Sequence, residues 1–484
     1  MRHRQERFLS VIETGLDAAL GTDDDLAQVP NEAAGETATP LARSPADLAF
    51  TKPDELTWWD WTVFLLHTAA EIEHALMVQY LYAAYSLGED NFQGPNVPPD
   101  AQNRARRWRR MIAGIAREEM GHLITVQNLL RFIGGTLNFE REDFPFRTLY
   151  PFRFQLEPLT RSSLAKYVAA EMPAKADQPA ELMGEIVLRA TGSAGGSQVN
   201  RVGPMYAELV TIFEDSTKLS DDDLSPETAD GFQAKEDDWH GSSIVIVKEL
   251  RSRADAVNAL VEIGEQGEGS WEPTNETDLS HFDRFIQIYQ EYPETDAAIE
   301  PVDWIPAHPV PTNPNTLISQ SSDALLERGR ITHPLARLWA QLSNVRYRML
   351  LLSVVHALYL KDPMEDNGSL TVRGHLVNWA FTEMRGEQLA GQLAGLRGVS
   401  KRLVQLPLKE EVSPQEQVAA LPFELPYTLA LPDRDPDRWR LHLALIEAAR
   451  GLIEQIEDAS GSDDVLEELK EIDLERRRLI EAQP

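Results

Sequence analysis

The sequence predicts an all-α protein, and three observations carry this prediction. Two long stretches, residues 56–87 and 101–133, repeat apolar residues with the period of a helix. Gly134-Gly135 follow the second stretch, where glycine commonly ends a helix. The chain also lacks the alternation of Val and Ile that a substantial sheet requires. We therefore expect a four-helix bundle with a long irregular insertion, followed by a C-terminal helical domain.

The predicted elements divide the chain into three parts. Residues 1–54 form an arm and linker with a short helix at 7–20, residues 55–295 a bundle, and residues 315–484 a C-terminal helical domain, with the proline-rich stretch 299–316 as the boundary. Besides the two long stretches, helices are expected at 161–171, 206–215, 242–266, 279–291, 333–360, 370–398, 437–457 and 463–481. The long irregular insertion lies between 172 and 240.

Composition limits the function classes. No apolar run reaches the length of about eighteen residues that a membrane span needs, and the charged N-terminus does not resemble a secretory signal, so a cytoplasmic location is expected. The net charge of −32 argues against binding to nucleic acid or to anionic membranes. The chain has no cysteine, so any transition metal must be held by His and carboxylates, which suit Fe, Mn or Zn.

The first two long helices each carry a carboxylate near the same level. If residues 88–100 join the helices as an antiparallel hairpin, Glu73 lies 14 residues before Leu87 and Glu119 lies 15 residues after Arg104. At a rise of about 1.5 Å per residue, the two side chains meet within about one turn. Both positions have apolar neighbours, and a buried carboxylate is costly unless it is paired, protonated or bound to a cation.

Glu119 and His122 point to such a cation. Residues three apart share one face of a helix, and the Glu-x-x-His pair is the arrangement that carboxylate metal centres use in four-helix bundles. The plain alternative is a solvated pair on an ordinary helix, because this spacing is common by chance. The basic island at 104–111, RARRWRRM, is interpreted as the solvated face of a helix start.

Four ordered segments give the chain a family resemblance. LLHTAAEIEHALMVQYLYAAYSL at 65–87, EEMGH at 118–122 with its following glycine pair, IGEQGEG at 263–269 and SHFDRF at 280–285 resemble a bacterial ferritin-like family. Its members include the iminophenyl-pyruvate dimer synthases, the imine-dimer synthases of violacein- and rebeccamycin-type pathways. The resemblance covers residues 55–295 and implies a ferritin-like bundle that binds metal.

Carried over to this chain, the resemblance implies a set of metal ligands. It makes Glu73 the ligand from the first helix and Glu119 with His122 the ligands from the second. Glu265 is the favoured ligand from a later helix, where Glu262 and Glu268 share its face, and Glu268 and His281 are further candidates. One segment departs from the family pattern, since Pro204 stands where the family usually carries a glutamate. The resulting site is mononuclear or dinuclear, or vestigial.

The resemblance implies a non-haem iron oxidoreductase that acts on a small amino-acid-derived or aromatic metabolite in secondary metabolism. Iron is the expected cofactor, with Mn or Zn as alternatives, and the expected partners are a small-molecule substrate and a second copy bound through the C-terminal helices. Two alternatives stay open: a non-catalytic metal-binding protein for iron handling, and a helical assembly scaffold whose metal site has decayed.

Overall fold

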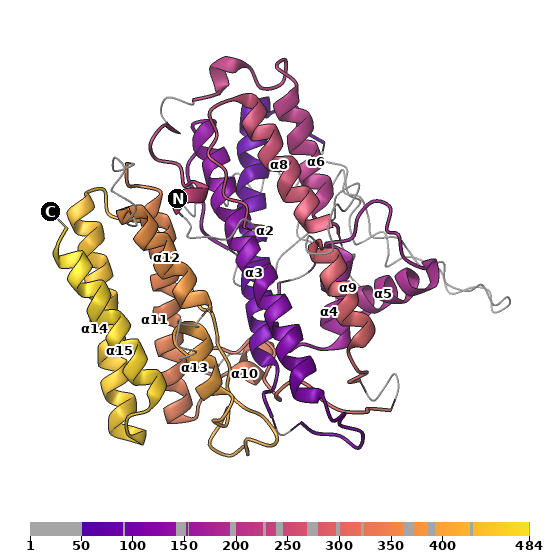
Figure 1. Ribbon diagram of the computed structural model, residues 1–484, viewed down its shortest axis with the longest axis vertical. Coiled ribbons are helices and arrows are strands. Elements are labelled where there is room, and N and C mark those ends of the chain that lie inside the picture. The colour runs from indigo at the N-terminus through magenta and orange to yellow at the C-terminus, as the bar shows by residue number, and fades with distance from the viewer. Residues whose placement is uncertain are drawn as a thin grey trace.

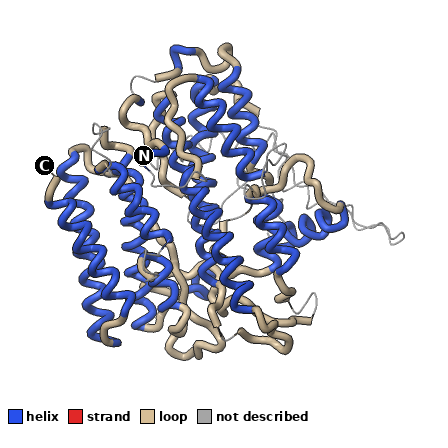
Figure 2. The backbone as a smooth tube through the Cα atoms, in the orientation of Figure 1, coloured by secondary structure: helices blue, strands red, loops and turns tan. Residues whose placement is uncertain are grey.

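A computed structural model describes residues 51–483 except 91, 142–151, 153, 194–199, 226–228, 239–244, 269–278, 297–300, 321–323, 362–370, 386–392 and 426–428. Within these residues the regular structure is helical, with isolated β-bridges and no strand, so the predicted fold class is confirmed (Figure 2). None of the described helices is long and apolar enough to cross a membrane. The predicted N-terminal arm, with its helix at 7–20, lies almost entirely outside the described residues.

The helices of the N-terminal half are α2 (Trp58–Ser86), α3 (Ala101–Phe132), α4 (Arg161–Ala170), α5 (Ala180–Ser193), α6 (Gly203–Glu214), α8 (Arg253–Glu268) and α9 (His281–Glu291). Those of the C-terminal half are α10 (Ala324–Gly329), α11 (Pro334–Ala357), α12 (Val372–Arg385), α13 (Gly395–Leu403), α14 (Asp435–Ser460) and α15 (Asp464–Glu481). Figure 1 shows α2 and α3 in the middle, with α6, α8 and α9 on one side and α11 to α15 on the other.

The α2–α3 hairpin forms as the sequence predicts. Thr57 caps α2 through a reciprocal pair of hydrogen bonds with Asp60, which satisfies backbone groups that the first turn leaves open. Gly134 ends α3 with a φ of 72°, a conformation that glycine adopts without strain. The Trp59 indole N–H donates to the Ile133 carbonyl at 2.8 Å, which joins the start of α2 to the end of α3 and makes the pair antiparallel.

The C-terminal half packs around α11, which contacts α12, α13 and α14. It also packs against the N-terminal half: the Tyr85 hydroxyl of α2 donates to the Met384 carbonyl of α12, and the buried His74 contacts the Tyr347 hydroxyl of α11. The domain boundary near residue 315 therefore stays a prediction, because the two halves share buried contacts.

Two predicted helices differ in the structure. Residues 245–250 were expected to be helical, but α8 begins only at Arg253. The preceding segment instead lies across α3, where Thr125 donates to the Ile246 carbonyl at 3.0 Å and Asn128 to the Lys248 carbonyl at 2.8 Å. The helix expected at 370–398 is two helices, since α12 ends at Arg385 and Gly395, with a φ of 55°, begins α13. Helix α5 falls in the region expected to be irregular.

Gly121 makes the crossing of 245–250 over α3 feasible. A Cβ atom at this position would lie 2.3 Å from the Val245 side chain and 2.9 Å from the Ile246 carbonyl oxygen, which is closer than real Cβ atoms approach. Only a residue without a side chain lets the segment lie this close to the helix. The segment thereby covers the turn of α3 that carries Glu119 and His122.

Candidate metal centre

The predicted meeting of the first two helices places three side chains together. The His122 Nδ1 atom lies 2.9 Å from a Glu119 carboxylate oxygen and 3.3 Å from a Glu73 carboxylate oxygen. All three side chains are buried, at 2% exposure each. Glu73 comes from α2 and the other two from α3, so the match in depth that the sequence predicted is present in the structure.

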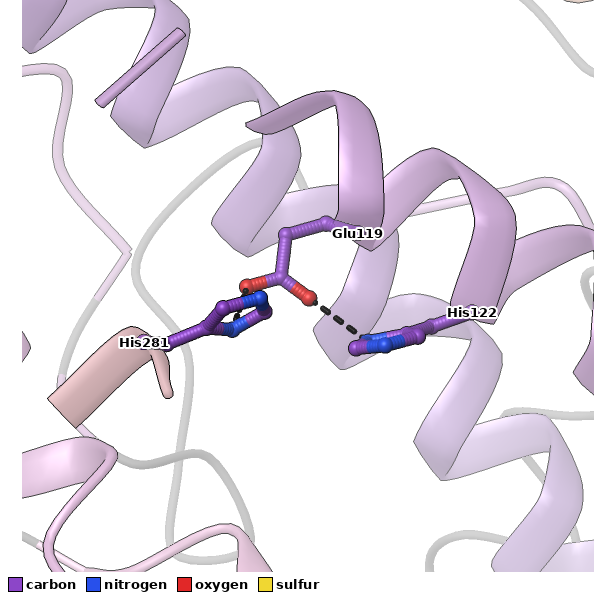
Figure 3. Close-up of side chains that lie close together, drawn as sticks. All are labelled: Glu119, His122 and His281. Carbon is purple, nitrogen blue, oxygen red and sulfur yellow. Dashed lines mark hydrogen bonds and ion pairs between the residues drawn. The ribbon is translucent and has the colours of Figure 1, made fainter. Parts of the chain in front are cut away.

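His281, from the first turn of α9, approaches the same carboxylate from the other side (Figure 3). Its Nδ1 atom lies 3.1 Å from the second oxygen of Glu119. Ser280 and Asp283 form the reciprocal cap that starts α9, and this cap makes His281 the first residue of the helix. Glu119 thus lies between two imidazole rings that come from different helices.

Glu171 is a further acidic group beside this cluster that the sequence did not reveal. It follows the last residue of α4, is 3% exposed, and places an oxygen 3.8 Å from His281 Nδ1. The Tyr80 hydroxyl donates to its other oxygen at 2.7 Å. No Glu-x-x-His pattern accompanies Glu171, so the local sequence gave no signal for it.

Helix α8 contributes differently from the prediction. Glu265, the favoured ligand, does not line the cavity at the cluster, whereas Gln266 places its side-chain oxygen 2.8 Å from His122 Nε2. Successive helical residues point about 100° apart, so the residue beside Glu265 faces the site in its place. Glu268 does line the cavity, and its carboxylate pairs with Arg201 at 3.3 Å. Glu262 instead pairs with Lys248 at 2.7 Å on a partly exposed surface.

Tyr206 of α6 occupies the part of the site where Pro204 breaks the family pattern. Its hydroxyl donates to the Glu73 carboxylate, and its side chain lines the cavity. Glu208, about one turn after Pro204 on α6, is not among the residues that line the cavity. A phenol from α6 therefore contacts Glu73.

Hydrogen bonds on the outer side of each imidazole fix which nitrogen faces the carboxylates. His281 Nε2 lies 3.0 Å from Glu118, which is held by Arg284, and His122 Nε2 lies 2.8 Å from the Gln266 oxygen. Because both partners are acceptors, the Nε2 atoms donate, and the Nδ1 atoms face the carboxylates, where each can hold a proton or, once deprotonated, offer its lone pair to an ion. Glu118 and Glu119 are both buried, but Glu118 contacts His281 at Nε2, whereas Glu119 contacts it at Nδ1.

The buried carboxylates and imidazoles of this cluster shift one another's pKa values. Burial, together with the charge of Glu119, raises the pKa of Glu73 to about 7. Burial alone would lower the pKa of His122, but the hydrogen bonds that His122 donates to Glu119 and Glu73 outweigh burial and raise this pKa to about 10. Protons on the imidazoles thus offset the buried carboxylates, which is the role that a metal ion fills in sites of this composition.

The geometry fits a metal ion. Three buried atoms have no aligned hydrogen-bond partner in the part of the chain that the structure describes: Glu73 Oε2, Glu119 Oε1 and His281 Nδ1. Ligand atoms of Glu119, His122 and His281 all lie within 4.8 Å of one another. Ligands at about 2.0–2.2 Å from one ion span up to about 4.4 Å, so small side-chain shifts complete such a set. The cavity leaves about 20 Å³ for the centre of a water-sized sphere, room for little more than one small ligand.

Carboxylates and histidines that converge from several helices are the arrangement by which helical bundles of the carboxylate–histidine class can hold metal ions. In agreement, residues 66–290 match the family model described as ferritin-like, so this part of the chain has a ferritin-like fold.

The chain is also 26% identical over 328 residues to dichlorochromopyrrolate synthase from Lentzea aerocolonigenes. This alignment covers 59% of the chain and only 30% of that enzyme. It confirms the predicted relationship to secondary-metabolism enzymes as a distant one. A ferritin-like protein from Caulobacter vibrioides is similar with a TM-score of 0.35 and 15% identity, over 66% of this chain and 94% of that protein.

Proposed function

We propose that this protein is a metal-dependent enzyme, specifically a non-haem iron oxidoreductase that acts on a small amino-acid-derived or aromatic metabolite. The observation that carries the proposal is the convergence of Glu73, Glu119, His122 and His281 on one buried cavity with unaligned ligand atoms. The distant relationship to dichlorochromopyrrolate synthase supports a role in secondary metabolism. Because the alignment covers less than a third of that enzyme, its substrate is not transferred.

In this proposal Glu119, His122 and His281 hold the ion, with Glu73 and Glu171 as additional or bridging ligands. Iron bound there would supply redox and O₂ chemistry, and the same N and O donors also suit Mn or Zn. The ferritin-like fold and the donor set favour iron, and the five acidic and imidazole groups leave both a mononuclear and a dinuclear centre open.

The surrounding residues orient the ligands and exclude water from the site. Glu118 and Gln266 orient the two imidazoles, and Tyr206 donates a proton into a hydrogen bond with Glu73. The buried walls, which include Leu76 and Ile263, keep bulk water away from the charged groups. Each ligand thus has a fixed orientation before any ion or substrate arrives.

Metal analysis of the purified protein tests the proposal. Glu119→Gln should lose iron, since it removes the carboxylate between both imidazoles, whereas the matched control Glu265→Gln should keep the iron content of the wild type. O₂ consumption with a panel of aromatic amino acids and their keto acids then tests the reaction. An unchanged iron content in Glu119→Gln would refute the site.

The second candidate is a non-catalytic protein for iron handling, and one observation favours it. The cavity beside the ligands is too small for an aromatic molecule, because its free volume of about 20 Å³ admits roughly one water. Iron bound in stoichiometric amounts, without substrate-dependent O₂ consumption anywhere in the panel, would support this candidate over the enzyme.

A further inference from the structure

The cavity at the metal centre approaches the protein surface between α6 and α8, two helices that pack side by side (Figure 1). Most of the described residues that line this cavity are buried, and three are partly exposed: Gly203, Gly264 and Glu268. Gly203 is the first residue of α6, and the other two lie in the last turns of α8. Because glycine has no side chain, Glu268 supplies the carboxylate at this opening, and carboxylate oxygens bind divalent cations.

The Glu268 carboxylate lies across the opening. A Cβ atom at Gly203 would lie 1.9 Å from Glu268 Oε1, so the carboxylate occupies the space that a side chain at the start of α6 would need. The Glu268 side chain is 22% exposed, and its Oε1 atom lies 3.3 Å from Arg201. Arg201 also donates to the Met172 carbonyl at 3.1 Å, which fixes the guanidinium group beside the opening. The carboxylate is therefore held where solvent and cavity meet.

Glu268 differs from the residues at the centre of the cavity in burial and in position. Glu119, His122 and His281 are at most 2% exposed, and their ligand atoms lie within 4.8 Å of one another in a group that does not include Glu268. All four residues nevertheless line the same cavity. Glu268 thus lies between the buried ligand group and the solvent.

The small volume of the cavity limits how an ion can reach the ligands. A divalent cation in water carries a shell of bound water molecules. The cavity leaves about 20 Å³ for the centre of a water-sized sphere, which is room for roughly one water. The ion must therefore lose most of its water shell before it passes inside, and this loss is costly unless protein oxygen atoms replace the waters.

We propose that Glu268 is the entry ligand of the metal centre. It takes a divalent cation from solvent, replaces part of the water shell and passes the ion to Glu119 and His281, without belonging to the final ligand set. This inference rests on the metal site of the proposed function and adds the route by which the ion arrives.

The proposal separates the rates of metal binding from the affinity. Entry and exit follow the same route, so the loss of an entry ligand slows uptake and release by the same factor and leaves the Kd unchanged. The loss of a ligand from the final set instead speeds release and weakens the Kd, as most affinity changes do. A comparison of both rate constants with the Kd therefore distinguishes the two roles.

Anaerobic rapid-mixing experiments with iron(II) and the metal-free protein test the proposal. A chromogenic chelator added after increasing times reports unbound iron at once and bound iron as it is released, and chelator competition at equilibrium gives the Kd. We expect Glu268→Gln to lower both rate constants by about tenfold or more and to change the Kd by less than about threefold. Glu268→Asp keeps the carboxylate and should take up iron faster than Glu268→Gln.

Glu262→Gln is the matched control. Glu262 also lies on α8 and forms a partly exposed ion pair, with Lys248 at 2.7 Å, but it does not line the cavity. This variant removes the same charge as Glu268→Gln and should take up iron at the rate of the wild type. Equal slowing in both variants would reduce the effect to general electrostatics and overturn the proposal.

The remaining outcomes separate the entry route from the metal site itself. Uptake by the wild type, its loss in Glu119→Gln and unchanged rates in a folded Glu268→Gln protein would overturn the entry route and leave the proposed site in place. Faster release with a weaker Kd in Glu268→Gln would make Glu268 a ligand of the final centre and also overturn the entry role. A wild-type protein that binds no iron(II) would overturn both the entry route and the proposed function.

Discussion

The chain has two clusters of buried carboxylates, one in each half, and different kinds of positive group offset their charge. In the C-terminal half, Arg346 of α11 pairs with Asp473 of α15 at 2.6 Å and with Glu383 of α12 at 3.2 Å, and Arg476 also contacts Glu383. Guanidinium groups there offset the carboxylates permanently. Burial would lower the pKa of Arg346, but Asp473 and Glu383 outweigh it and raise this pKa above its ordinary value.

In the ferritin-like domain the carboxylates face imidazoles instead of guanidinium groups. An imidazole can exchange its proton for a metal ion, which arginine cannot do. The comparison teaches that burial of charge does not by itself identify a functional site. What separates the two clusters is whether the positive partner can be exchanged for an ion and whether a cavity adjoins it.

The largest change in stability should come from the C-terminal cluster of Arg346, Asp473 and Glu383. Arg346→Met removes the guanidinium group that pairs with the buried Asp473 and Glu383. We expect this change to lower the free energy of unfolding by about 3–5 kcal/mol. Urea unfolding followed by circular dichroism measures this. The exposed control Arg450→Met should change stability by less than about 0.5 kcal/mol. Similar stability of both variants would mean that the C-terminal ion pairs carry no structural role.

Metal addition should stabilise the folded protein, and it should do so through the cluster of Glu119, His122 and His281 alone. At a free iron(II) concentration of 100 times the Kd, the ferritin-like domain should gain about 2.7 kcal/mol of stability, because the ion binds the folded chain. Anaerobic thermal unfolding would detect the gain as a higher Tm. Glu119→Gln should lose this shift, whereas a folded Arg346→Met protein should keep it. A shift of equal size in Glu119→Gln would place the ion elsewhere.

Glu118→Gln should have an intermediate effect. Glu118 accepts the His281 Nε2 proton, so its loss weakens the orientation of a ligand without removing one. Such supporting residues typically change metal affinity by about 10–100-fold. Competition with a chromogenic chelator measures the affinity, and Glu265→Gln serves as the control outside the cavity. If the two variants bind metal equally well, His281 does not rely on Glu118.

Tyr206→Phe should give the smallest change. The hydroxyl donates to Glu73 from α6, and the loss of one such hydrogen bond costs about 1 kcal/mol, or roughly fivefold in metal affinity. The same chelator competition applies. No change at all would indicate that Glu73 is not a ligand, since its orientation would then have no consequence for the ion.

The sequence predicted what local pattern encodes. Helical periodicity gave the α2–α3 hairpin, and the Glu-x-x-His spacing put Glu119 and His122 on one face, where the structure places them. Glu171 and Tyr206 were missed because each reaches the site through tertiary packing. Glu171 follows a short helix without a motif, and Tyr206 replaces an expected carboxylate with a phenol.

The error at α8 has a different cause. Three glutamates spaced by three share a face, and the sequence could not tell which face meets α3. That choice depends on where the helix starts and on how the extended segment 245–250 lies before it, and both are set by contacts with α3. The phase of a helix within a bundle is therefore a tertiary property. Pairing of two copies through the C-terminal helices stays a prediction.

Gly121 adds a packing contact to the Glu-x-x-His motif. It lies between Glu119 and His122, and its missing side chain is what lets Val245 pass over the helix. The spacer of the motif is thus not a free position, because it encodes a contact with a segment more than a hundred residues later. In a sequence that carries this motif with a bulkier spacer residue, the same covering segment could not lie there, and the ligand turn would face a different neighbour.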